Sequence, residues 1–347
     1  MSLKTGRLSA VLCAALTSAC LGAPATAGTT LTGVTGPYTV VMEMDPGLPG
    51  HTVYRPKNLE RVKGKLPVVA FGNGACGNEG NVFAPFLSEI ASFGYVVVAN
   101  GPIVPGAMRA AQQLWAAMHS AADHPGQPAG GPGSKGPPLP KFPRVQPSTT
   151  TELTETLRWA QSQGKAQSGI YADKLDPAEL AVMGQSCGGL QALAAASDPS
   201  VKTAVILNSG VIRGSQPHDL PLPPGLPPPD LSHLPATARS LEALHAPTLY
   251  LIGGSTDIAY DNAREDFKEI TSVPVFLASM PSVGHMGTYW QPHGGEFAAV
   301  VVRWLDWQLK DDGKAAALFT GERCGLCKSP LWRIQRKNWR WREAMMK

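Results

Sequence analysis

The stretch 180-LAVMGQSCGGLQALAAAS-197 carries the most informative pattern in this sequence. It opens with a short apolar run typical of a buried strand, and 188-GGLQALAAAS-197 has the small and apolar residues of a packed helix. Between them, 184-GQSCG-188 matches G-x-S-x-G. In a strand–turn–helix context, this motif places a serine on a tight, strained turn with its hydroxyl exposed. The pattern therefore nominates Ser186 as a nucleophile.

Strands and helices alternate on both sides of this turn. Apolar runs typical of buried strands lie at 66–71, 95–100, 203–208, 248–253 and 274–279, and helical patterns lie at 81–93, 151–163, 261–270 and 295–310. Such alternation predicts a mostly parallel sheet covered by helices on both faces. The segment 38-YTVVMEM-44 predicts an antiparallel strand at the edge.

Two segments rich in Pro and Gly interrupt the alternation, at 123–148 and 214–236. Their composition cannot build a packed core, so we interpret them as surface excursions, either lids over a site or passive loops. With 347 residues the chain can bury a sizeable core. We expect a single α/β domain over 28–347, with a basic, cysteine-containing tail at 320–347.

The first 27 residues have the features of an export signal. Lys4 and Arg7 precede the apolar run 8-LSAVLCAALTSACLGA-23, and 25-ATA-27 is a small-x-small cleavage site. We prefer this interpretation to a buried N-terminal helix or a lipoprotein anchor at Cys20. No later segment is long and apolar enough to span a membrane. The mature protein is therefore expected to be secreted or periplasmic.

The net charge of +4 is too small to imply nucleic-acid binding. Much of the excess lies in the last twenty residues, which contain seven Lys or Arg against one Glu. The tail 332-WRIQRKNWRWR-342 is compatible with contact to anionic lipid or polysaccharide, although Trp packing beside solvated Arg is the simpler interpretation. We expect a monomer without a transmembrane segment.

A serine nucleophile needs a base to take its proton and an acid to orient that base. After a G-x-S-x-G turn the acid and the histidine follow in that order, each in a loop after a later strand. Asp257 in 253-GGSTDIAYD-261 and His285 in 281-PSVGHMG-287 meet this requirement. Asp261 is the rival acid, but it fits the start of the next helix. His293 is the rival base and lies nearer the last helix.

An oxyanion hole needs two backbone N–H groups. One is expected from Cys187, directly after the serine, and the other from the Gly-rich 72-GNGACG-77. Within this loop we favour Ala75, with Gly74 and Cys76 as alternatives. The loop has neither the ending of a P-loop nor the spacing of a dinucleotide fingerprint.

The chain resembles the α/β-hydrolase superfamily, and within it the dienelactone-hydrolase-related branch that includes bacterial cutinases and polyester hydrolases. The matching stretches span about residues 60 to 310 and are 66-LPVVAFGNGACG-77, 91-ASFGYVVVAN-100, 174-KLDPAELAVMGQSCGG-189, 249-LYLIGGSTDIA-259 and 283-VGHMG-287. The resemblance implies an eight-stranded α/β-hydrolase fold and esterase-type activity. It also implies Ser186, Asp257 and His285 as a catalytic triad, with Ala75 and Cys187 as oxyanion donors.

Several positions depart from that pattern. Cutinase-like relatives carry GHSMGG where this chain has Gln185 and Cys187, and the aromatic clamp expected after the next strand is replaced by 208-NSGV-211. Dienelactone hydrolases use a cysteine nucleophile, whereas here Ser186 holds that position. The departures leave the hydrolytic chemistry in place and argue against polyester hydrolysis.

Removal of the signal leaves four cysteines, an even number that favours disulfides in an oxidising compartment. If Ala75 and Cys187 donate to one oxyanion, Cys76 and Cys187 must lie close together, as a disulfide or as two buried thiols; we prefer the disulfide. Cys324 and Cys327 form a C-x-x-C without further ligands nearby for zinc. We expect them to form a local disulfide.

These patterns predict an exported serine hydrolase that cleaves small-molecule or polymeric carboxylic esters through an acyl-enzyme, without metal or organic cofactor. A peptidase or lactone hydrolase of the same fold, and a non-catalytic binding module on a hydrolase scaffold, are the alternatives. Phe83, Met286, Tyr289 and Trp290 are candidates for the wall of the acyl pocket, and each is equally compatible with a place in the core.

Overall fold

The computed structural model describes residues 28–122, 147–213 and 235–338. The predicted signal at 1–27, nearly all of both Pro-rich excursions and the end of the tail lie outside the described residues.

The described strands form one mixed, mostly parallel sheet of ten strands in the order β1-β2-β3-β5-β4-β6-β7-β8-β9-β10. The strands are β1 (Thr29–Leu31), β2 (Val40–Glu43), β3 (His51–Pro56), β4 (Leu66–Gly72), β5 (Val96–Asn100), β6 (Leu175–Gln185), β7 (Val201–Leu207), β8 (Thr248–Gly253), β9 (Val275–Met280) and β10 (Arg333–Lys337). Neighbours from β5 to β9 pair in parallel. At the two edges, β1, β2, β3 and β10 pair antiparallel.

The expected mostly parallel α/β sheet is confirmed, but it has ten strands rather than eight. The sequence patterns missed three edge-side strands. Of these, β10 has the sequence RIQRK, whose charged residues give no apolar signal. It joins the sheet through its backbone, pairing antiparallel with β9.

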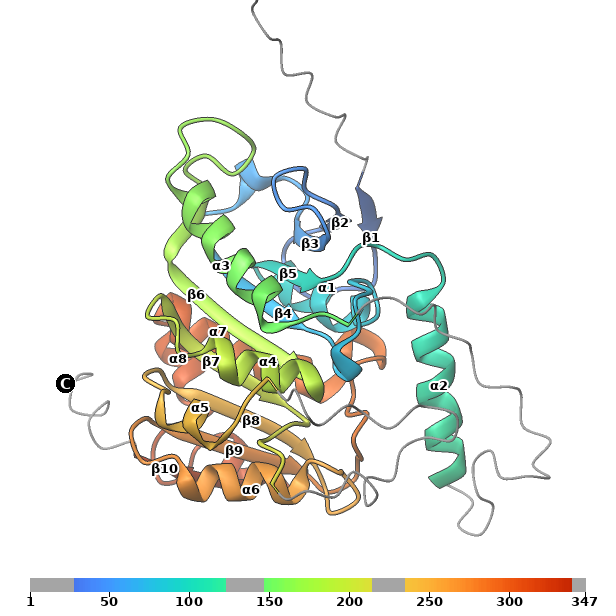
Figure 1. Cartoon of the computed structure of the whole chain (residues 1–347), viewed down its shortest axis with the longest axis vertical. Helices are drawn as coiled ribbons and strands as arrows, with labels where there is room; N and C mark the ends of the chain where they lie inside the picture. The colour runs from blue at the N-terminus through green and yellow to red at the C-terminus, as the bar shows by residue number, and fades with distance from the viewer. Residues whose placement is uncertain (1–27, 123–146, 214–234, 339–347) are drawn as a thin grey trace, which may run out of the picture.

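Helices cover both faces of the sheet (Figure 1). The α-helices are α1 (Ala84–Ser92), α2 (Ala107–Ala122), α3 (Thr150–Gly164), α4 (Cys187–Ala195), α5 (Ala238–Glu242), α6 (Tyr260–Glu269), α7 (Gly295–Lys310) and α8 (Gly313–Ala316). Helices α3, α4, α5 and α6 lie in front of the sheet in Figure 1, and α1, α7 and α8 lie behind it. Helix α2 stands at one side, beyond the end of the sheet.

Alternating residues of the central strands feed two separate hydrophobic cores. On β4, Val69 and Phe71 belong to the cluster packed against α1 and α7, whereas Val68 and Ala70 belong to the cluster packed against α3 and α4. All four are fully buried. Both faces of the central strands are therefore covered, which explains their nearly continuous apolar sequences.

The strand order changes direction between β4 and β6. From β4 the chain passes outward to β5 on one side, and then returns to place β6 on the other side. In open α/β sheets, ligands bind beyond the carboxyl ends of the strands at such a switch point. The loops after β4 and β6 both lie there, and they are the loops that carry 72-GNGACG-77 and Ser186.

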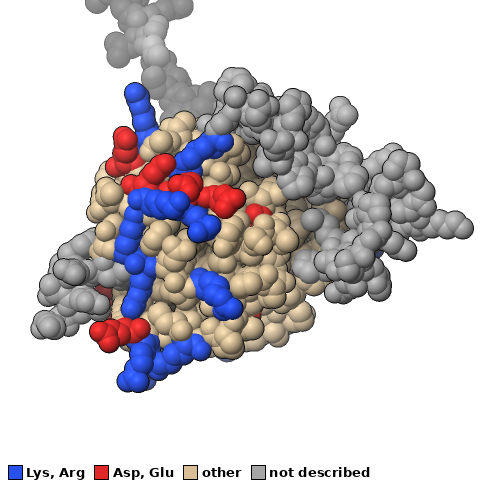
Figure 2. Space-filling model, turned by 90° about the horizontal axis from the view of Figure 1, so that it is seen from below, with Lys and Arg blue, Asp and Glu red and all other residues tan. Residues whose placement is uncertain are grey.

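Charged side chains of both signs are interleaved on the face seen from below (Figure 2). On α6, Arg264 pairs with Asp261 and Lys268 pairs with Glu265. Acidic side chains therefore lie beside basic ones along α6. Over the ranges that the structure describes, no helix has the length and apolar character needed to cross a membrane.

Candidate active site

Ser186 lies on a sharp turn between β6 and α4, where its backbone adopts φ 54° and ψ −119°. Positive φ is strained for a residue with a side chain, so the turn depends on its surroundings. A Cβ atom on Gly188 would overlap the backbone of Gly72 on β4, and one on Gly184 would overlap the backbone of Gly188. Glycine at these positions lets the turn pack between β4 and α4.

Ser186, His285 and Asp257 form a continuous hydrogen-bonded array. Nε2 of His285 lies 2.9 Å from Oγ of Ser186. Nδ1 of the same ring lies 2.7 Å from Oδ1 of Asp257. The three residues come from the turn after β6, the loop after β9 and the loop after β8, and they are 99 and 28 residues apart along the chain. The geometry suits transfer of the serine proton to an imidazole that is oriented by a carboxylate.

The carboxylate of Asp257 is fully buried and well supplied with donors. Oδ1 accepts from the backbone N–H of Ala259 at 3.0 Å, and Oδ2 accepts from the N–H of Gly253 at 2.8 Å and from Nδ2 of Asn208 at 2.7 Å. Burial raises the pKa of Asp257, but the hydrogen bonds and the nearby His285 outweigh it, so the net pKa lies below the ordinary value. Asp257 is therefore held as a carboxylate.

The rival acid and base lie elsewhere. The side chain of Asp261 is 90% exposed and is paired loosely with Arg264 on α6. Nδ1 of His293 lies 2.9 Å from the carbonyl oxygen of Gly33, near the N-terminal edge of the sheet. Neither residue takes part in the array around Ser186.

The second expected loop forms a short 3₁₀ turn, η2 (Gly74–Cys76), directly after β4. Ala75 and Cys76 have positive φ values of 54° and 50°. Cys187 is the first residue of α4, so its N–H has no acceptor within the helix. Its position at a helix N-terminus also favours negative charge nearby. The turn η2 and the start of α4 are therefore the two candidate sources of oxyanion donors.

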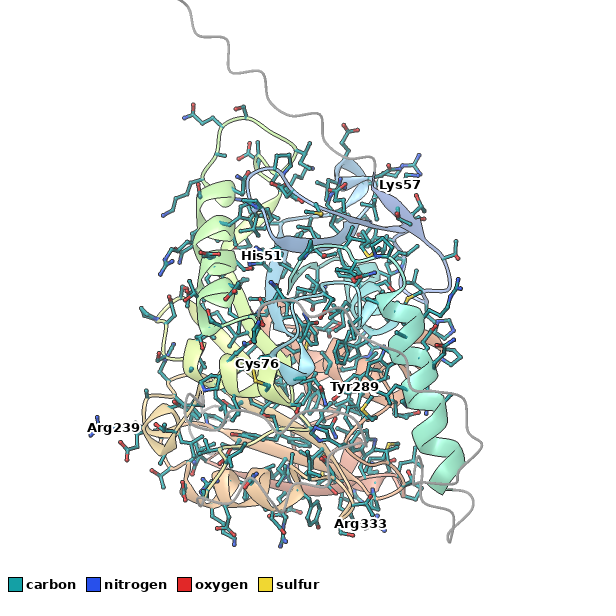
Figure 3. All side chains as sticks on the ribbon, turned by 45° about the vertical axis from the view of Figure 1, so that its right-hand side comes forward. His51, Lys57, Cys76, Arg239, Tyr289 and Arg333 are labelled. Atoms are coloured by element: carbon teal, nitrogen blue, oxygen red, sulfur yellow. A yellow bond between two sulfur atoms is a disulfide. The ribbon has the colours of Figure 1, made fainter. Side chains whose placement is uncertain are left out.

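The structure joins these two segments through Cys76 and Cys187, whose sulfur atoms lie at disulfide distance with Cα atoms 5.1 Å apart. Cys76 lies near the centre of the molecule, between α4 and α2 (Figure 3). The bridge links positions 111 residues apart and holds η2 against α4. The local pair Cys324 and Cys327, with Cα atoms 5.0 Å apart, also lies at disulfide distance, so both expected pairs are close enough to be bonded.

A buried polar network supports η2 from behind. The carbonyl oxygen of Cys76 accepts from the backbone N–H of Ser148 at 2.8 Å. Nε2 of Gln191 on α4 donates to the carbonyl oxygen of Ser148 at 2.7 Å. Nδ2 of Asn73 donates to the carbonyl oxygen of Asn100 at 2.7 Å. The backbone of η2 is thus held by hydrogen bonds as well as by the sulfur bridge.

Gln185, which precedes the serine, connects three parts of the site. Its Nε2 donates to the carbonyl oxygen of His285 at 3.1 Å. Its Oε1 lies so close to the backbone of Gly74 that a Cβ atom there would overlap it. Gln185 therefore ties the serine turn to the histidine loop and to η2, a role that no sequence pattern indicates.

The four candidates for the acyl pocket divide into two groups. Phe83, Tyr289 and Trp290 are buried and pack against one another, with ring centroids 5.3 Å apart for Phe83 and Tyr289 and 4.9 Å apart for Phe83 and Trp290. They belong to the core between α1 and the sheet. Met286, beside His285, is partly exposed. Of the four, Met286 is thus the residue best placed to touch a substrate.

Helix α2 also reaches the site. Nε1 of Trp115 donates to the carbonyl oxygen of Gly287 at 3.4 Å, two residues after His285. The helix has a usable sequence signal, since 107-AMRAAQQLWAAMHSAA-122 is rich in Ala, Gln and Met. This helix is not among the helices predicted from the sequence.

No protein-family model matches the chain, and no curated protein matches its sequence. Within 28–122, 147–213 and 235–338, no group of His, Cys, Asp or Glu side chains is arranged to hold a metal ion. The chemistry of the site is therefore inferred from its own geometry.

Proposed function

We propose that this chain is an α/β-hydrolase-type serine hydrolase that cleaves carboxylic esters through an acyl-enzyme. The observation that carries the proposal is the array Ser186–His285–Asp257, with contacts of 2.9 Å and 2.7 Å, on a strained turn at the switch point of the sheet. A merely structural serine needs neither the positive φ nor a histidine held by a buried carboxylate.

In the proposed reaction, Oγ of Ser186 attacks the carbonyl carbon of the ester while Nε2 of His285 accepts the serine proton. Asp257 orients the ring and stabilises the resulting imidazolium. The negative charge on the carbonyl oxygen is stabilised by the N–H groups of Ala75 and Cys187. The intermediate then collapses, and the departing alkoxide takes the proton from His285. A water molecule then attacks the carbonyl carbon of the acyl-enzyme while His285 accepts its proton. Collapse of this second intermediate returns the proton to Ser186 and releases the carboxylic acid.

The test is hydrolysis of p-nitrophenyl esters, from acetate to long acyl chains, by the mature protein and by Ser186→Ala. We expect kcat to fall by roughly five to six orders of magnitude in the variant. Ser197→Ala is the matched control, because Ser197 is an exposed serine just after α4 whose hydroxyl donates to the carbonyl oxygen of Ala194 in the preceding helical turn. Equal activity of wild type and Ser186→Ala would refute the proposal.

A fluorophosphonate that labels reactive serines separates the alternatives. Labelling of Ser186 without ester turnover would point to amides or lactones, since the triad serves those acyl groups too. Absence of both labelling and turnover would leave a binding module on a hydrolase scaffold.

We further propose that the protein is exported. The two cysteine pairs at disulfide distance suit an oxidising compartment, and residues 1–27 have the composition of a signal. Mass spectrometry of the protein recovered outside the cytoplasm should find a mature chain that begins at Gly28. An intact N-terminus on protein confined to the cytoplasm would contradict export.

A further inference from the structure

Asn208 stands directly after β7 and touches two of the loops that build the proposed site. It is fully buried and has a positive φ of 41°. Its Nδ2 donates to Oδ2 of Asp257 at 2.7 Å and to the carbonyl oxygen of Gly284 at 3.3 Å. Gly284 precedes His285 in the chain. One amide group thus links the acid to the loop that carries the base.

The amide of Asn208 must face Asp257 with its nitrogen. An ionised carboxylate only accepts hydrogen bonds, so a reversed amide would set two oxygen atoms against each other. The oxygen side of Asn208 accepts from the hydroxyl of Tyr289. Burial, together with the charge of Asp257, raises the pKa of Tyr289 well above its ordinary value, so this hydroxyl keeps its proton. Tyr289 therefore favours the amide orientation that donates to Asp257.

The donors around Asp257 show why this orientation matters. Each carboxylate oxygen accepts two hydrogen bonds, Oδ1 from His285 and the N–H of Ala259, and Oδ2 from the N–H of Gly253 and from Asn208. Two of the four donors are backbone N–H groups, one at the end of β8 and one in the turn before α6. The other two donors to Asp257 in the part of the chain that the structure describes are the side chains of His285 and Asn208. Its loss would free Oδ2 on one side and allow the carboxylate to rotate away from the imidazole.

We propose that Asn208 and Tyr289 are positioning residues of the proposed hydrolysis, extending the array to Tyr289–Asn208–Asp257–His285–Ser186. The inference rests on the proposed function and assigns Tyr289 a role other than lining the acyl pocket. Neither residue touches the reacting atoms. They act by holding Asp257, and through it the ring of His285, in line with the serine hydroxyl.

The test compares Tyr289→Phe with Tyr250→Phe. Both tyrosines are fully buried and donate to a side-chain oxygen, but the hydroxyl of Tyr250 bonds to Asp266 at 3.0 Å, away from the site. We expect Tyr289→Phe to lower kcat about tenfold at unchanged KM, the effect of one lost hydrogen bond. Tyr250→Phe should leave kcat within twofold of wild type, even if it lowers thermal stability as much.

Asn208→Leu is the stronger perturbation, and we expect it to lower kcat about 100-fold because the catalytic groups are no longer aligned. Thermal melts establish that each variant is folded; if Asn208→Leu is not, Tyr289→Phe alone decides. The kcat loss must appear without a matching rise in KM. If Tyr289→Phe and the folded Asn208→Leu both keep kcat within twofold of Tyr250→Phe, the inference is wrong.

A second readout does not depend on turnover. The proton on Nδ1 of His285, shared with Asp257, should give a downfield ¹H NMR resonance in wild type and in Tyr250→Phe. In Tyr289→Phe and Asn208→Leu it should shift upfield or broaden beyond detection. If wild type hydrolyses no ester and is not labelled by fluorophosphonate, the proposed function fails and positioning for hydrolysis fails with it; a shifted resonance would then show only that Asn208 and Tyr289 hold Asp257 against His285. An unchanged resonance in a fully active wild-type background would overturn positioning alone.

Discussion

The bridge between Cys76 and Cys187 joins the two segments that carry the proposed oxyanion donors, and replacing both residues by Ser tests its contribution. The double variant avoids leaving a single reactive thiol. The bridge closes a loop of 111 residues. In the chain-entropy model such a loop corresponds to about 4.8 kcal/mol at 25 °C. We therefore expect the free energy of unfolding to fall by as much as that value.

We expect the same double variant to lose only a modest part of its catalytic activity. Removal of one oxyanion donor costs about 10²- to 10³-fold in kcat, but the bridge positions a donor and does not supply one. The hydrogen bonds that hold η2 remain in the variant, since the N–H of Ser148 still donates to the carbonyl oxygen at position 76 and Gln191 still donates to Ser148. We expect kcat to fall about tenfold, at constant KM, because η2 gains freedom that these hydrogen bonds only partly restrain.

The matched control replaces Cys324 and Cys327. Their separation of three residues corresponds to about 1.6 kcal/mol in the same model. They lie between α8 and β10, a part of the chain that carries none of the proposed catalytic residues. Urea unfolding with linear extrapolation and p-nitrophenyl ester kinetics measure both quantities for both variants. Equal losses of stability in the two double variants would refute the loop-length reasoning. An unchanged kcat in Cys76→Ser/Cys187→Ser would show that the bridge does not shape the oxyanion hole.

Further predictions concern single residues around the same turn. Asp257→Asn should lower kcat by about 10⁴-fold, because the imidazole loses its orienting carboxylate. The pKa of Asp257 is lower in the folded state than in the unfolded state, so its carboxylate stabilises the fold fully at pH values above the unfolded-state pKa. This stabilisation is lost as the pH falls through the lower folded-state pKa. Urea midpoints of wild type and Asp257→Asn should therefore converge in acid below about pH 4. Gly188→Ala should cost about 3 kcal/mol in urea unfolding, since its Cβ would overlap the backbone of Gly72. Gln185→Leu should lower kcat about tenfold through loss of the bond to the carbonyl oxygen of His285, whereas a kcat above half of wild type would exclude that role.

The central elements could be predicted because their signals are strong and local. Apolar runs at 66–71 and 248–253 correspond to β4 and β8, which are buried on both faces. The chain order Ser186, Asp257, His285 placed each residue after a later strand of the sheet, and parallel strands bring such loops to one edge. Chemistry and topology together were sufficient to nominate these three side chains, and the structure places them within hydrogen-bonding distance.

The remaining features depend on contacts that no local pattern records. The strand β10 is mostly charged, so its side chains give no strand pattern, and it joins the sheet by backbone pairing with β9. Tyr289 lies four residues from His285 and is aromatic, which suggested a pocket wall. Its burial and its bond to Asn208 depend on β7, more than 80 residues earlier in the chain. Asn208 itself was noted only as a departure from an aromatic clamp.

Gln185 and Cys187, the two residues that depart from the cutinase pattern on either side of Ser186, share one physical consequence. The pattern of the cutinases that the sequence resembles has His and Met beside the serine, at the positions where this chain has Gln185 and Cys187. Gln185 contacts the loop of His285 and the backbone of Gly74, and Cys187 bonds to Cys76. Both residues therefore connect the serine turn to η2 or to the histidine loop. The turn η2 contains two non-glycine residues at positive φ and is costly to hold in place. A covalent bridge and a buried amide on the serine turn supply that restraint, so the unusual residues at 185 and 187 belong with the unusual loop at 74–76.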